Sequence, residues 1–155
     1  MNSINLRAPL AALALVVLAA CENPVKPAEH EDPAGLVLRA GTTEVVRVVG
    51  LGLNGTATGV LAVTESGQTP VLTVALIDDH GDELTLDEET ALGVESDAPA
   101  TATWQGTAAG AYTGRVAGHA AGTATLKFRL YHGSVDTGHV DAEFWVPVTV
   151  TAVQP

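Results

Sequence analysis

The chain contains one cysteine, seven lysines and arginines, and only 4% aromatic residues among its 155 positions. A single cysteine excludes a disulfide framework and a cysteine-rich metal site. Seven basic residues against 18 acidic ones give a formal net charge of −11, which excludes the basic surface that nucleic-acid binding requires. Nucleic acid is therefore not an expected partner. Without disulfides, stability must come from a hydrophobic core, and this length is sufficient for one domain.

The N-terminus has no apolar run long enough to cross a membrane. Arg7 is followed by eleven uninterrupted apolar residues, Leu10–Ala20, whereas a membrane-spanning helix needs about 20. A short apolar run behind a basic start is typical of a secretory signal. We therefore interpret residues 1–20 as a signal peptide.

The cysteine stands directly after this run, in Leu18-Ala19-Ala20-Cys21. This segment resembles the lipobox of bacterial lipoproteins; the alternative is an ordinary signal with an incidental cysteine. The resemblance implies cleavage before Cys21, a diacylglycerol on its sulfur and usually an acylated amine, with palmitate among the acyl chains. Several chains anchor a protein stably, so membrane lipid becomes the expected partner. Because Glu22, not aspartate, follows the cysteine, the resemblance favours the outer membrane.

Residues 21–34 contain three prolines, four acids and one bulky apolar residue, Val25. Such a composition cannot bury enough apolar surface to fold, so it predicts a flexible tether.

From residue 35 to 155 the pattern predicts strands separated by Gly- and Asp-rich turns. Val140–Val150 places an apolar residue at every even position, which is typical of a strand with one buried face. Only Leu86–Leu92 is compatible with a helical turn. The other expected strands are Gly35–Ala40, Glu44–Val49, Thr58–Glu65, Val71–Ile77, Thr101–Gln105, Ala111–Ala117 and Leu126–Leu130. This spacing predicts an all-β sandwich.

Four segments resemble bacterial immunoglobulin-like domains: Val74–Gly81, Ser96-Asp97, Gly114–Gly118 and Ala121–Leu126. The resemblance covers about residues 71–130. It implies an immunoglobulin-like β-sandwich of about seven to nine antiparallel strands, used for display, spacing or binding, with no catalytic residues to transfer. A strand-rich extension precedes the match and a long strand follows it. The chain is then either an elaborated single sandwich or a variant topology.

The last two strands are expected to form a hairpin. In one register Arg129 faces Asp141 and Lys127 faces Glu143, and in another Arg129 faces Glu143. Both registers pair opposite charges, so the pattern does not choose between them.

The chain has five histidines, and a divalent zinc or copper site is the alternative function that they suggest. His132 and His139 flank the hairpin turn, with His119 or His30 as further candidate ligands. Regular alternation, however, places His132 on the face of Leu130 and His139 on the face of Asp141. Unless the turn is irregular, the two imidazoles cannot share an ion and are ordinary surface histidines.

Two further groups of residues invite a functional interpretation. The acidic stretch Asp78–Glu83 lacks the spacing of an EF-hand calcium loop. No serine stands in a nucleophile elbow, so we expect that the protein is not an enzyme. By alternation Trp145 points away from the core. It is either a contact surface, for an envelope protein or a polysaccharide, or it is covered by another part of the sandwich.

Overall fold

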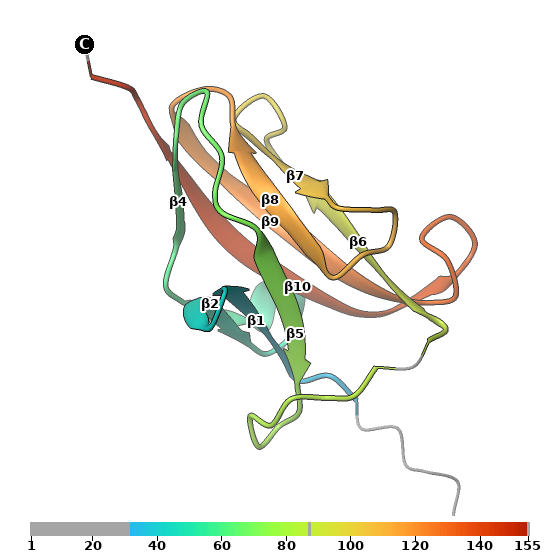
Figure 1. Ribbon diagram of the computed structural model, residues 1–155. Coiled ribbons are helices and arrows are strands. Elements are labelled where there is room, and N and C mark those ends of the chain that lie inside the picture. The colour runs from blue at the N-terminus through green and yellow to red at the C-terminus, as the bar shows by residue number, and fades with distance from the viewer. Residues whose placement is uncertain (1–31, 87, 155) are drawn as a thin grey trace, which may run out of the picture. The chain divides into compact units, whose positions relative to one another are not determined.

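The computed structural model describes residues 32–86 and 88–154. Cys21, His30, the predicted signal peptide and most of the predicted tether lie outside this part. Glu31–Pro155 forms one compact unit. Its strands make two sheets, and the long strands β9 and β10 run behind β8 in Figure 1.

The first sheet has six strands in the order β3-β2-β1-β5-β8-β7. Its strands are β1 (Gly35–Ala40), β2 (Thr43–Val49), β3 (Thr56–Thr58), β5 (Leu72–Ile77), β7 (Ala102–Gly106) and β8 (Thr113–Gly118). A short 3₁₀ helix, η1 (Gly52–Asn54), separates β2 from β3. All strand pairs of this first sheet are antiparallel, and β5 pairs with β8 over only two residue pairs.

The second sheet has four strands in the order β4-β10-β9-β6. Its strands are β4 (Leu61–Thr64), β6 (Thr90–Ser96), β9 (Gly122–His132) and β10 (His139–Thr151). β9 pairs antiparallel with both β6 and β10, whereas β4 pairs parallel with the last residues of β10.

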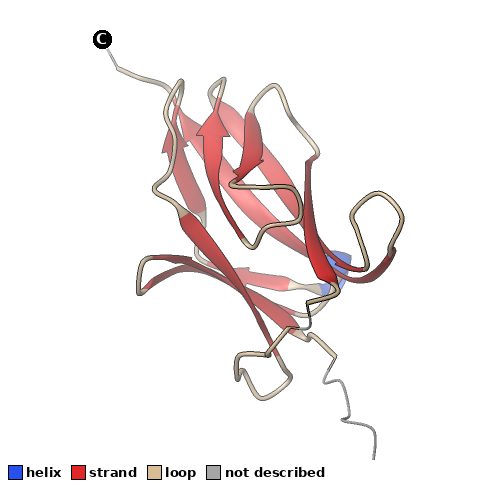
Figure 2. Ribbon diagram, turned by 45° about the vertical axis from the view of Figure 1, so that its right-hand side comes forward, coloured by secondary structure: helices blue, strands red, loops and turns tan. Residues whose placement is uncertain are grey.

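The strands of the two sheets are drawn in red in Figure 2. The core lies between the sheets and is built from alternating inward residues of both. Phe128 of β9 and Phe144 of β10 face each other across the strand pair and are fully buried. The ring of Trp104 meets Phe128 edge-on from the opposite sheet, with centroids 5.2 Å apart. Such an arrangement is favourable because the positive edge of one ring meets the negative face of the other.

The predicted all-β sandwich is confirmed. The described residues form ten strands, because β3 and β4 are separate and β6 is an additional strand; β4 and β10 form a parallel pair. The segment Leu86–Leu92, which was compatible with a helical turn, instead leads into β6, which begins at Thr90. The apolar pattern did not reveal this strand, because Gly93 has no side chain. The ring of Tyr131 fills the space beside Gly93 and would lie only 2.7 Å from a Cβ atom at that position.

The segments outside the immunoglobulin-like match belong to the same sheets. β1 pairs with β5, and β4 pairs with β10. The structure therefore fits an elaborated single sandwich. Within residues 32–86 and 88–154, it has no helix with the length and hydrophobicity that crossing a bilayer requires.

Candidate functional site

The outer face of the β9–β10 hairpin carries a row of charges. Arg129 pairs directly with Glu143, which is the second of the two registers that the sequence allowed. Its Nε donates to Glu143 at 2.5 Å, and its Nη1 donates to Glu95 of β6 at 2.8 Å. One guanidinium thus links three strands of the sheet.

The same carboxylate holds Trp145, whose Nε1 donates to Glu143 at 2.6 Å. Lys127 lies opposite Trp145, with its Nζ 4.9 Å from the ring centroid. The donated hydrogen bond from Trp145, together with Arg129, holds the pKa of Glu143 below its ordinary value, and the ion pair raises the pKa of Arg129. Trp145 therefore faces outward as the alternation predicted, and Lys127 and Glu143 flank it in a half-buried position.

The turn end of the hairpin is irregular, because the register shifts between Val140 and Ala142. Asp141 is the extra residue of this β-bulge. Beyond it Val140 pairs with Tyr131, and His139 pairs with His132. A bulge of one residue exchanges the two faces for everything that follows. This explains why Val140 is 47% exposed although it continues the apolar alternation.

The bulge brings His132 and His139 together. Directly opposite residues of an antiparallel pair share a face, and the two ring centroids are 5.5 Å apart at an interplanar angle of 33°. The expectation that their imidazoles point to opposite faces is wrong, because it assumed an unbroken alternation through Asp141.

Two carboxylates accompany the histidines. His139 Nε2 lies 2.9 Å from Asp141 Oδ1, and His132 Nε2 lies 3.6 Å from Glu89 Oε2. Glu89 comes from the turn before β6, where its carbonyl accepts the N–H of Gly133 at 2.6 Å. Sequence reasoning missed Glu89, because it enters only through the pairing of β6 with β9.

His119 is remote from this group. It follows β8 and lies beside the start of β9, whereas His132 is the last residue of β9. Its Nε2 lies 2.8 Å from Thr103 Oγ1, so His119 does not join the predicted ligand set. His30, like Cys21, lies outside the described residues.

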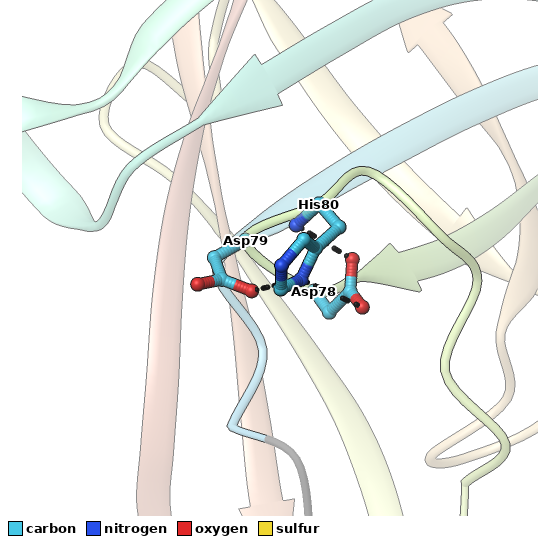
Figure 3. A group of neighbouring side chains, drawn as sticks. All are labelled: Asp78, Asp79 and His80. Carbon is cyan, nitrogen blue, oxygen red and sulfur yellow. Dashed lines mark hydrogen bonds and ion pairs between the residues drawn. The ribbon is translucent and has the colours of Figure 1, made fainter.

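A second acidic group with a histidine lies in the turn after β5. Figure 3 shows the ring of His80 between the carboxylates of Asp78 and Asp79, with Nδ1 2.6 Å from Asp79. Asp78 Oδ1 accepts the backbone N–H groups of His80 and Asp82 at 2.9 and 2.8 Å. The hydrogen bond from Asp82 is the main cause of the lowered pKa of Asp78. This carboxylate therefore closes a tight turn.

The serine hydroxyls near the strands have local structural partners. Ser134 Oγ lies 2.8 Å from Thr137 Oγ1 inside the hairpin turn, and Ser96 Oγ accepts the N–H of Ala98 at 3.2 Å. In the adjoining position, Asp97 accepts the N–H of Thr125 at 2.7 Å. These side chains fix loops.

No family model and no curated protein matches the chain. Solved structures of the S-layer protein SbsC are similar in fold. Domains 5–6 share 24% identity over 71% of this chain and 47% of theirs, with a TM-score of 0.46. Domains 4 and 5 share 22% identity over 77% of this chain and 66% of theirs, with a TM-score of 0.45. Domains 1–6 share 20% identity over 77% of this chain and 20% of theirs, also with a TM-score of 0.45. The chain thus spans less than two thirds of the length of these structures.

Proposed function

We propose that the protein is a lipid-anchored, non-catalytic module of the bacterial cell envelope. The observation that carries the proposal is the order of three segments: the motif Leu18-Ala19-Ala20-Cys21, an acidic proline-containing stretch, and a sandwich whose first strand begins at Gly35. The residues between Cys21 and Gly35 have a maximum reach of about 45 Å. Acylated Cys21 would hold the sandwich to the outer membrane and leave it room to meet a partner.

The surface of the sandwich fits a binding or structural role. The hydroxyls of Ser96 and Ser134 are engaged in loop hydrogen bonds. Trp145 lies half-buried on the outer face among charged side chains, and an aromatic of this kind suits an envelope protein or a polysaccharide.

Cell fractionation of the full-length chain tests the anchor. Wild type is expected in the membrane fraction and in the detergent phase of a Triton X-114 separation, because two or more acyl chains anchor stably. Cys21→Ser should move the protein to the soluble fraction. Glu22→Gln is the matched control and should remain membrane-bound. Retention of Cys21→Ser in the membrane, at the wild-type level, would refute lipid anchoring through this residue.

A further inference from the structure

The end of the β9–β10 hairpin gathers two imidazoles and two carboxylates from three chain segments. We propose that His132 and His139, completed by Asp141 and Glu89, bind one divalent transition-metal ion, with zinc as the reference ion. This proposal goes beyond the anchoring function and does not depend on it.

The separation of the two rings suits a shared ion. With metal–nitrogen bonds of about 2.0–2.1 Å and tetrahedral angles, two imidazoles bound through Nε2 place their ring centroids roughly 5 Å apart. The observed separation is 5.5 Å. Both rings are exposed, with side-chain exposures of 48% and 73%, so neither is held by packing and both can rotate to direct a nitrogen at one ion.

Each Nε2 already lies near a carboxylate oxygen, at 3.6 Å for Glu89 and 2.9 Å for Asp141. A cation that enters beside these atoms would take the two nitrogens, and one or both of the nearby carboxylate oxygens, as ligands. Two nitrogens and one or two oxygens are typical of zinc and copper sites, whereas calcium and magnesium prefer oxygen ligands alone. The ligand set therefore selects the transition metals.

The backbone that carries the ligands is ordered before any ion binds. His132 pairs with His139 on one side and with Thr90 on the other. The N–H of Gly133 donates to the carbonyl of Glu89 at 2.6 Å, and the N–H of Gly138 closes the turn onto Ser134 at 2.8 Å. An ordered backbone lowers the conformational entropy that metal binding costs, and the remaining cost is that of orienting the exposed side chains.

The group Asp78, Asp79 and His80 is the rival site, since its ligand atoms lie within 4.8 Å of one another. Its chemistry is less suitable for a cation. Asp78 Oδ1 already accepts two backbone N–H groups. It also offers a single imidazole.

Calorimetric titration of zinc chloride into the full-length chain in detergent tests the proposal. We expect one equivalent to bind with a Kd below about 10 µM. His132→Gln and His139→Gln should each weaken binding by at least about tenfold. His119→Gln is the matched control and His80→Gln tests the rival site; both should bind as wild type does.

A face-exchange variant tests the role of the bulge. His139→Val combined with Val140→His keeps the composition but moves the imidazole to the face of Tyr131, so zinc binding should weaken as in His139→Gln. If circular dichroism shows that a variant is unfolded, the NMR resonances of the imidazole groups in the wild-type chain decide which histidines bind zinc. Zinc should shift those of His132 and His139 and leave the other histidines unchanged. Any one of three results would overturn the proposal: a Kd above about 10 µM for wild type, loss of zinc binding only in His80→Gln, or resonance shifts confined to other histidines.

Discussion

Glu143 is the residue that joins Arg129 and Trp145 on the outer face of the hairpin. It accepts hydrogen bonds from Arg129 and from Trp145, at 2.5 and 2.6 Å, and its side chain is 27% exposed. Such partly buried, charge-assisted hydrogen bonds contribute more than an exposed ion pair, whose typical value is about 0–1 kcal/mol. The three side chains therefore stabilise the middle of the hairpin.

We expect Glu143→Gln to lower the free energy of unfolding by about 1 kcal/mol at pH 7. The pKa of Glu143 is lowered from 4.5 in the folded state, so its contribution is present above that pH and is lost as the pH falls through the folded value. The difference between variant and wild type should shrink at pH 3. Urea unfolding of the full-length chain at both pH values measures it.

The matched control is Glu88→Gln, which changes an exposed carboxylate in the turn before β6. It should leave the free energy of unfolding within about 0.5 kcal/mol of wild type at both pH values. A Glu143→Gln deficit that stayed constant down to pH 3 would show that the carboxylate charge is not its cause.

At the scale of elements, the β9–β10 hairpin shows what the sequence could predict. Alternating apolar residues predicted both strands, and the charges of Arg129 and Glu143 restricted the register to two choices. The bulge at Asp141 could not be predicted, because Val140 is apolar and continues the pattern through it. The pairing of His132 with His139 depends on that single extra residue.

The strand β6 was missed for a related reason. Its inward positions include Leu92, but Gly93 contributes no side chain to the pattern, and its place is taken by the ring of Tyr131. Glu89 consequently could not be placed beside His132. Contacts made through partner strands are not encoded in the spacing of either strand alone.

β4 is the element whose packing is easiest to test. It has four residues, pairs parallel with the end of β10, and buries Leu61 to 1% exposure. Leu61→Ala should destabilise the domain by about 2–4 kcal/mol, since it removes buried apolar atoms and leaves a cavity. Urea unfolding midpoints measure the loss.

Ala62→Ser, at the neighbouring exposed position, is the control for this strand and should change stability by less than about 0.5 kcal/mol. If Leu61→Ala cost no more than Ala62→Ser, β4 would not be packed against the core as the structure has it.

At the scale of the whole molecule, the sequence predicted an all-β sandwich from residue 35 onward, and the structure confirms it. The pairing of β1 with β5 and of β4 with β10 was left open, because pairing between strands far apart in sequence follows from the assembled core. Lipid anchoring at Cys21, which the lipobox resemblance suggests, remains a prediction that the described residues do not address.

The central claim is that Cys21 becomes the acylated first residue of the mature protein. The intact mass of the protein purified from membranes tests this claim most directly. We predict a chain that starts at Cys21 and is heavier than its polypeptide by a diacylglyceryl group, with or without a further acyl chain. An unmodified polypeptide mass, whether it starts at Met1 or at any residue after the apolar run, would contradict the account.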